Sequence, residues 1–184
     1  MLKKMRGFTL IELLIVVAII GILAALLIPN ALEAIQKAKQ KSAMKEIMVI
    51  STAAVDYMTD HGNFEAVELG GDLTPSTELY QALSSFYVKV IPSGDPWNSP
   101  YRAYTGSNVG SVIGAAAGLV SDDDFAAQSY GRGGSAGGGI DGSYYATDTP
   151  EGGRYFVSAM TDFNNDLIAW NGSWIVGPKT NVGS

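Results

Sequence analysis

The sequence contains no cysteine, one histidine and few charged residues. The lack of cysteine among 184 residues excludes disulfide bonds and metal sites built on thiolates. The lone histidine, His61, excludes zinc sites that use a histidine pair. Because catalytic nucleophiles and general bases are so often drawn from these two residue types, we expect no enzyme and no organic cofactor.

The positive charges are unevenly distributed. Three of the twelve basic residues, Lys3, Lys4 and Arg6, precede the first apolar stretch. The rest of the chain holds 9 basic and 18 acidic residues, a net charge of −9. Nucleic-acid binding needs a basic surface that contacts phosphates, so this acidic body argues against a nucleic-acid partner.

A long apolar run follows these basic residues. It covers residues 8–28, which are 21 residues with a single charge at Glu12. As a helix the run would be about 32 Å long, which matches the hydrocarbon thickness of a bilayer. A secretory signal peptide fits poorly, because the run is long and no small-residue cleavage site ends it. The basic flank predicts a cytoplasmic N-terminus and a single pass through the membrane.

Glu12 is the residue that a plain membrane anchor leaves unexplained. A carboxylate inside a bilayer costs about 2.5–3.5 kcal/mol or more, so it usually has a partner. Cleavage of the chain after Gly7 would create a cationic amine on Phe8, four residues before Glu12. Pairing of this amine with Glu12 is possible within one chain, and between staggered neighbours it would also set the register of packed helices.

The string Gly7-Phe8-Thr9-Leu10-Ile11-Glu12 resembles the leader and cleavage motif of type IV prepilins and of the pseudopilins of type II secretion. This resemblance implies that a prepilin peptidase cuts after Gly7 and methylates the amine of Phe8. It also implies that Glu12 neutralises the amine of a neighbouring Phe8 during assembly. The implied fold is the α+β pilin fold, in which one long N-terminal helix packs on a small antiparallel sheet.

The helical pattern continues beyond the apolar run. Apolar residues recur at three- and four-residue steps, at Leu32, Ile35, Ala43, Ile47, Ile50, Ala54 and Tyr57. We expect one helix from about Phe8 to Asp60, ended by Gly62 in a left-handed conformation. The resemblance implies that this helix loosens between Gly21 and Pro29 inside filaments, which agrees with the weak helix propensity of glycine and proline.

These patterns predict four parts of the chain. They are a leader (1–7), a transmembrane and filament-core half-helix (8–29), an amphipathic half-helix (30–62) and a globular head (63–184). In the head we expect a short helix from Thr74-Pro75 to about Phe86, and strands at 101–104, 155–159, 167–170 and 173–176. Asn171-Gly172 predicts a tight hairpin turn between the last two strands. Residues 106–142 hold 11 of the 22 glycines, so we expect a long surface loop or insertion there.

A second string points to one branch of the family. Asp95-Pro96-Trp97, followed by Pro100-Tyr101, resembles a segment of the major pseudopilins of type II secretion. By itself the string predicts a rigid loop with Trp97 packed into the core. The resemblance favours a structural subunit of the pseudopilus, which polymerises through its N-terminal helix to drive protein export. A type IV pilus subunit for adhesion, motility or DNA uptake is the alternative.

The same resemblance implies several partners. They are further copies of the chain in a helical filament, a prepilin peptidase, an inner-membrane assembly platform with its ATPase, minor pseudopilins and the bacterial inner membrane itself. The head would lie in the periplasm, and the assembled filament would span the periplasm or extend outside the cell.

A candidate calcium site follows in the head. Asp162, Asn164 and Asp166 place oxygen-bearing side chains at alternate positions, and calcium prefers several oxygen ligands. An EF-hand is excluded because Ser173 occupies the position of its bidentate glutamate. An Asx-rich turn without metal is the alternative. The segment resembles the calcium-binding loop of major pseudopilins, and this resemblance adds Ser158 to the candidate ligands.

Overall fold

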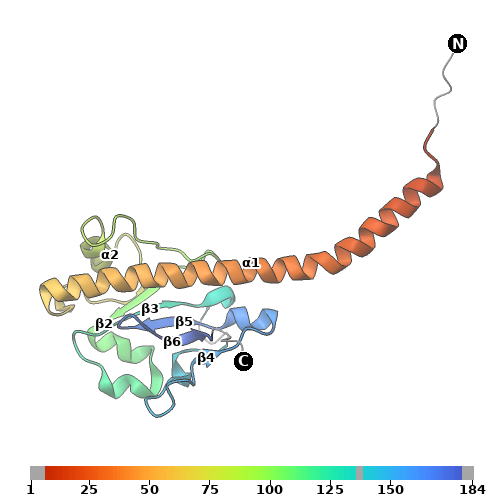
Figure 1. Ribbon diagram of the computed structural model, residues 1–184. Helices are drawn as coiled ribbons and strands as arrows, with labels where there is room; N and C mark the ends of the chain where they lie inside the picture. The colour runs from red at the N-terminus through yellow and green to blue at the C-terminus, as the bar shows by residue number, and fades with distance from the viewer. Residues whose placement is uncertain (1–6, 136–138, 180–184) are drawn as a thin grey trace. The chain divides into compact units, whose positions relative to one another are not determined.

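The computed structural model describes residues 7–135 and 139–179 of the chain. The chain divides into two compact units, Met1–Gln36 and Lys37–Ser184. The helix α1 (Leu10–His61), drawn from red to yellow in Figure 1, contributes its first half to the smaller unit and its second half to the larger one.

The second half of α1 has the amphipathic pattern that the sequence predicts. Its buried apolar residues include Ala43, Ile47, Ile50, Ala54 and Tyr57. The helix ends at a glycine in the left-handed region, where Gly62 has φ of 82° and its N–H donates to the carbonyl of Met58 at 2.7 Å. The predicted extent and end of the helix are therefore confirmed. Leu32 and Ile35 do not share this burial, since they are 48% and 51% exposed in the smaller unit.

The described residues of the larger unit include a six-stranded sheet in the order β1-β2-β3-β5-β6-β4. Its strands are β1 (Gly70–Asp72), β2 (Arg102–Thr105), β3 (Phe125–Ser129), β4 (Arg154–Tyr155), β5 (Leu167–Trp170) and β6 (Ser173–Pro178). Neighbouring strands are antiparallel except β4, which pairs with β6 in parallel. The predicted α+β class, with a long helix on a mostly antiparallel sheet, is confirmed.

Short helical segments connect these strands. They are α2 (Glu78–Leu83) and the 3₁₀ segments η1 (Glu65–Val67), η2 (Gly106–Ser111), η3 (Gly114–Leu119), η4 (Gly131–Gly133), η5 (Gly142–Tyr144) and η6 (Met160–Asn164).

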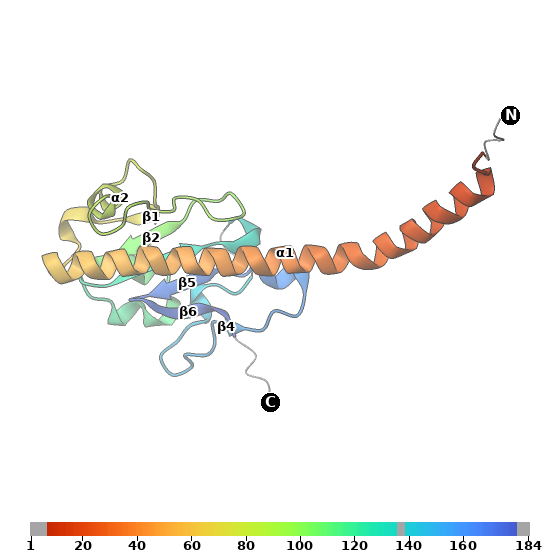
Figure 2. The same cartoon turned by 45° about the horizontal axis from the view of Figure 1, so that its top comes forward.

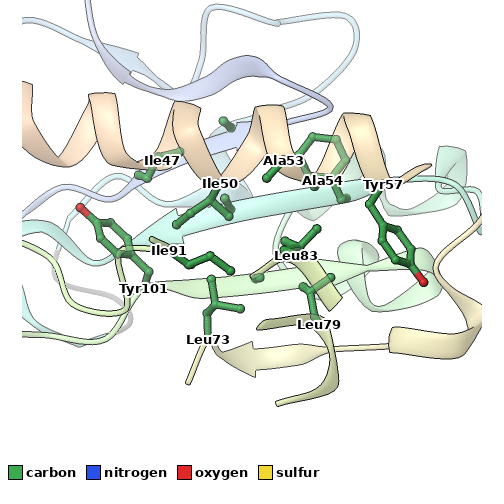
Figure 3. Close-up of a cluster of buried hydrophobic side chains, with 14 of the residues drawn as sticks. Ile47, Ile50, Ala53, Ala54, Tyr57, Leu73, Leu79, Leu83, Ile91 and Tyr101 are labelled. Carbon is green, nitrogen blue, oxygen red and sulfur yellow. The ribbon is translucent and has the colours of Figure 1, made fainter. Parts of the chain in front are cut away.

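The second half of α1 packs across one face of the sheet (Figures 1 and 2). Ala103 of β2, Ala127 of β3 and Ala169 of β5 lie side by side in the sheet register and belong to the same core as α1. Because alanine projects a single methyl group, this row allows the helix to lie close to the strands. Larger side chains complete the core, among them Ile47, Ile50, Tyr57, Leu73, Leu79, Leu83, Ile91 and Tyr101 (Figure 3).

The opposite face of the sheet is covered by a second core. Alternate residues of the same strands, Tyr104, Ala126 and Ile168, pack there with Val109 of η2 and with Ile113. The central strands are therefore buried on both faces.

The prediction that residues 106–142 form a surface loop is wrong. This stretch contains β3, which lies between β2 and β5, and every residue of β3 is buried. The sequence of β3, Phe-Ala-Ala-Gln-Ser, lacks an apolar–polar alternation because both of its faces are covered. Some of the glycines allow close packing instead: a Cβ atom on Gly142 would collide with the carbonyl oxygen of Val112.

The short helix α2 begins later than predicted. The backbone N–H and the hydroxyl of Thr77 both donate to the carbonyl of Thr74, at 2.9 and 2.8 Å. These bonds form a turn over the predicted first turn of the helix, so that α2 covers only Glu78–Leu83.

The C-terminal strands are predicted unevenly. The hairpin of β5 and β6 is confirmed, and Asn171 and Gly172 have φ of 47° and 76°, as a type I′ turn requires. The strand expected at 155–159 is reduced to β4, Arg154–Tyr155, and Phe156 beyond it is 58% exposed.

Candidate assembly site

The candidate site lies at the start of α1, where Thr9 caps the helix. The backbone N–H and the hydroxyl of Thr9 both donate to Oε2 of Glu12 at 2.8 Å. In return, the N–H of Glu12 donates to Oγ1 of Thr9 at 3.3 Å. This reciprocal arrangement is a capping box, which satisfies N–H groups that the start of a helix leaves unpaired. The Thr-x-x-Glu spacing of the sequence is typical of a capping box, although the predictions above did not include one.

The predicted cleavage point is accessible just before this cap. Gly7 is exposed, and no atom lies within 4 Å of the position that a Cβ on it would occupy. Phe8 is 78% exposed. In this uncleaved chain Phe8 carries an amide rather than an amine, and Glu12 is bonded to Thr9. The predicted roles of Gly7, Phe8 and Glu12 in cleavage, methylation and assembly stay predictions.

The first half of α1 presents a bare apolar surface. None of its most apolar 18-residue window is buried; Leu10, for example, is 82% exposed and Leu26 is 70% exposed. Among the described residues, α1 is the one helix long and apolar enough to cross a membrane. An apolar surface of this extent marks an interaction site, so this segment requires lipid or sister helices around it.

Gly21 and Pro29 both lie inside α1, which is unbroken from Leu10 to His61. Proline has no N–H to donate to the carbonyl four residues earlier. Beside this gap, Nδ2 of Asn30 donates to the carbonyl of Leu26 at 3.4 Å. The helix therefore contains two intrinsically weak positions, and its loosening between them inside a filament stays a prediction.

The segment that starts at Asp95 is hydrogen-bonded to β3 and to α1. Oδ1 of Asp95 accepts from the N–H groups of Trp97 and Ser99, at 3.0 and 2.8 Å, and Oδ2 accepts from the hydroxyl of Ser129 in β3 at 2.7 Å. The fully buried Tyr101 donates to Oε2 of Glu46 in α1 at 2.7 Å. The predicted packing of Trp97 against the core is confirmed.

The residues predicted to bind calcium occupy different settings. Oδ2 of Asp162 accepts from the N–H groups of Ser158 and Ala159, both at 2.7 Å, and from the hydroxyl of Ser158 at 3.1 Å. These bonds hold the pKa of Asp162 below its ordinary value. Asn164 is the last residue of η6.

Asp166 is 1% exposed and directly precedes β5. Its Oδ2 accepts from Nε2 of Gln128 at 2.7 Å, whereas its Oδ1 has no hydrogen-bond partner. Burial raises the pKa of Asp166 to about 7. The residue lines a cavity together with Asp141 and Tyr130, which the sequence did not connect with it. Among the described residues no three His, Cys, Asp or Glu side chains gather as a metal site, and calcium stays a prediction.

Comparisons with known proteins agree with the N-terminal motif. Residues 2–28 match the family described as the prokaryotic N-terminal methylation motif. The chain is 31% identical over 115 residues to the type II secretion system core protein G of Aeromonas hydrophila. The alignment covers 60% of this chain and 80% of that protein. It is 32% identical over 120 residues to the protein of the same name from Vibrio cholerae, with the same two shares. No solved structure matches the chain.

These alignments are several times longer than the apolar run of 21 residues, so the similarity is not confined to a membrane helix. The alignments cover 80% of each relative, and the separate family match at residues 2–28 contains the motif around Gly7 and Glu12. The resemblance that the sequence predicts is thereby confirmed, and the chain belongs to the family of the type II secretion system core protein G.

Proposed function

We propose that this chain is a structural, non-catalytic subunit of a type II secretion pseudopilus, which polymerises through the first half of α1 to drive protein export. The observation that carries the proposal is the bare apolar surface of α1, with Glu12 as its single charge. Membership of the core protein G family supports it, because the relatives are named as components of this secretion system.

In this proposal the subunit first waits in the inner membrane. The apolar half of α1 spans the bilayer, with the basic leader in the cytoplasm and the head in the periplasm. A prepilin peptidase cuts after Gly7 and methylates Phe8. The cut removes Lys3, Lys4 and Arg6 and leaves one cationic amine beside the apolar run.

Assembly then depends on Glu12. In apolar surroundings an unpaired carboxylate is unfavourable, so a neighbour that brings its Phe8 amine to Glu12 is held in one register. The capping box keeps Glu12 at a fixed place on the helix until this partner arrives. The assembly platform, its ATPase and the minor pseudopilins are the proposed partners in this step, and Gly21 and Pro29 allow α1 to loosen as the helices pack.

We also propose that the head binds calcium. Asp166 supports this, because its buried Oδ1 lacks a partner that a cation would supply. Ser158, Asp162 and Asn164 are the other candidate ligands. Millimolar calcium is expected to raise the melting temperature of the wild-type chain and to leave that of the Asp162→Ala, Asp166→Ala double variant unchanged. A wild-type melting curve that is the same in calcium and in chelator contradicts this proposal.

Co-expression with a prepilin peptidase and the secretion apparatus tests the main proposal. The intact mass of the processed chain is expected to begin at methylated Phe8. Glu12→Ala is expected to lower the yield of sheared filaments by about tenfold or more, because the amine loses its partner. Glu78→Ala, which removes an exposed carboxylate from α2 in the head, is the control and is expected to assemble normally.

A chain that still begins at Met1, or filaments that form without Glu12, would contradict the proposal. Secretion separates the two kinds of filament: a pseudopilus subunit is needed for export of folded proteins, whereas a type IV pilus subunit is needed for adhesion, motility or DNA uptake. The segment at Asp95, shared by resemblance with major pseudopilins, favours the first outcome.

A further inference from the structure

The head contains a groove with an apolar floor and a lysine rim. It is lined by Lys41, Met44 and Lys45 of α1 and by Val157, Pro178 and Lys179 from the C-terminal part of the chain. Met44, Val157 and Pro178 are half-buried, whereas Lys41 and Lys45 are exposed. We call this feature the lysine groove.

The lysine groove concentrates the positive charge of the body. Only nine basic residues follow the leader, and four of them line the groove: Lys37, Lys41, Lys45 and Lys179. Lys179 forms an ion pair with Glu151 at 3.0 Å. A charge cluster of this kind on an otherwise acidic body favours an anionic partner.

A complementary surface lies elsewhere on the same head. Asp122 lines one hollow with Glu65 and Glu68, and Asp123 lines the next with Val55. These four acidic residues are all exposed, and the described residues that line the two hollows include no lysine or arginine. Apolar surface accompanies them, since Val55 is 41% exposed and Leu119, which precedes Asp122 by three residues, is 61% exposed. We call residues 55, 65, 68 and 119–123 the acidic end.

The two surfaces cannot meet within one head. Lys41 and Val55 lie on the same helix 14 residues apart, a separation of about 21 Å along α1. Two copies with parallel helices, shifted along their axes by about this length, would bring the acidic end of one against the lysine groove of the other. Such a contact joins two different surfaces and does not close on itself, so repetition of it extends a filament.

We propose that the lysine groove of one copy binds the acidic end of a second copy. The same contact, from the head of one subunit to the head of the next, repeats along the filament. Asp122 and Asp123 approach the amines of Lys41 and Lys45, while the apolar side chains at the acidic end cover Met44 and Val157. The inference rests on the proposed pseudopilus function. In it, the contact between heads helps to fix the axial register of neighbouring subunits, together with the pairing of Glu12 between the helices.

An anionic lipid headgroup is the competing occupant, because lysine amines bind phosphate as well as carboxylate. The apolar floor favours a protein partner, since a headgroup has no apolar surface to cover Met44, Val157 and Pro178. The acidic end matches both features of the groove, its charge and its apolar floor.

Charge reversal in the full-length chain, co-expressed with the peptidase and the secretion apparatus, tests the contact. Lys41→Glu with Lys45→Glu, and separately Asp122→Lys with Asp123→Lys, are each expected to lower filament yield by about tenfold or more. The quadruple variant restores opposite charges and is expected to regain most of the wild-type yield. Lys89→Glu and Asp148→Lys, exposed and outside both surfaces, are the controls. Thermal melting of each variant in detergent identifies any that fail to fold.

A disulfide test is independent of charge, because the natural chain has no cysteine. Lys45→Cys combined with Asp123→Cys is expected to give a ladder of covalent multimers when assembled filaments are oxidised. A chain with only one of these changes cannot propagate such a ladder, and dimers are its upper limit.

The outcomes separate the two levels of inference. Wild-type filaments together with normal assembly of both charge-reversed variants, and no ladder, would overturn the groove contact and leave the proposed function intact. A lysine-reversal defect that the acidic reversal does not rescue, with loss of binding to vesicles containing an anionic phospholipid, would assign the groove to the membrane instead. A wild-type chain that forms no filaments under conditions of full processing contradicts the proposed function itself, and the contact with it.

Discussion

At the scale of single residues, Asp166 is the most unusual side chain of the head. It is buried next to β5, with one oxygen bonded to Gln128 and the other without a partner. Tyr104 donates to Oε1 of the same Gln128 at 3.0 Å, which orients the amide so that its Nε2 donates to Oδ2 of Asp166. A carboxylate in this position is poorly compensated when it is ionised.

The stability of the head is expected to fall as pH rises from about 4 to about 7. Burial raises the pKa of Asp166 from its ordinary 3.8 to about 7. Between these two pH values the carboxyl loses its proton in the unfolded chain but keeps it in the folded chain, so a rise in pH favours the unfolded chain. The loss is about 2–4 kcal/mol at most. Asp166→Asn, which cannot ionise, is expected to abolish this slope in urea titrations carried out with chelator.

Asp162→Asn is the control for this prediction. Hydrogen bonds lower the pKa of Asp162, so its contribution is complete above the ordinary pKa and is lost only as pH falls below it. Its replacement is therefore expected to leave the slope of stability against pH between about pH 5 and 7 unchanged. The difference in the free energy of unfolding between this variant and the wild type is expected to be about the same at each pH in that range. An Asp166→Asn head that keeps the wild-type slope would show that another group titrates there.

At the scale of elements, local signals explain which predictions succeed. The 3.6-residue pattern and Gly62 define the second half of α1, and Asn171-Gly172 defines the β5–β6 hairpin, because in each case the necessary information lies within a few neighbouring residues. β3 escaped prediction because small residues buried on two faces give no alternation, and glycines surround it. β4 has only two residues, and its partners in β6 lie 23 residues later in the sequence, so no local pattern indicates the pairing.

The same reasoning applies to the candidate site. The Gly7–Glu12 motif is contiguous and could be read directly, whereas the pairing of Asp166 with Gln128 joins residues 38 positions apart. The lysine groove likewise combines α1 with the end of β6, so no local pattern indicates it.

The hairpin turn offers a test at this scale. Gly172→Ala is expected to lower the free energy of unfolding by about 1 kcal/mol, because Gly172 has φ of 76° and a Cβ is unfavourable there. No atom would contact the new methyl group, so the whole effect is conformational. Gly118→Ala is the matched control: its methyl group also meets no atom, but its φ is not in the left-handed region, so no loss is expected. Equal effects in urea denaturation of the two variants would contradict this account.

At the scale of the whole molecule, the two compact units differ in what they require from their surroundings. The larger unit buries one side of the second half of α1 and both faces of its sheet in its own cores, whereas none of the described apolar side chains of the smaller unit is buried. Only the larger unit meets the usual condition for independent folding, which is a hydrophobic core of its own.

A chain of residues 37–184 is therefore expected to be a soluble, folded monomer without detergent. Gel filtration is expected to show a monomer. Its melting temperature is expected to lie within about 5 °C of that of the full chain in detergent, since residues 7–36, the described part of the deleted segment, contribute no buried apolar side chain. Aggregation of this fragment, or a loss of its cooperative transition, would show that the first half of α1 supports the head.

The bare surface of α1 has a consequence for the energetics of the proposed filament. Lipid tails are as apolar as leucine side chains, so transfer of this helix from the bilayer into a bundle of its sisters brings little hydrophobic gain. Specific pairs such as Glu12 with Phe8, and close packing between helices, are left to decide between the two environments. A balance this even lets an external motor move the equilibrium either way, and the same subunits can return to the membrane when the filament is dismantled.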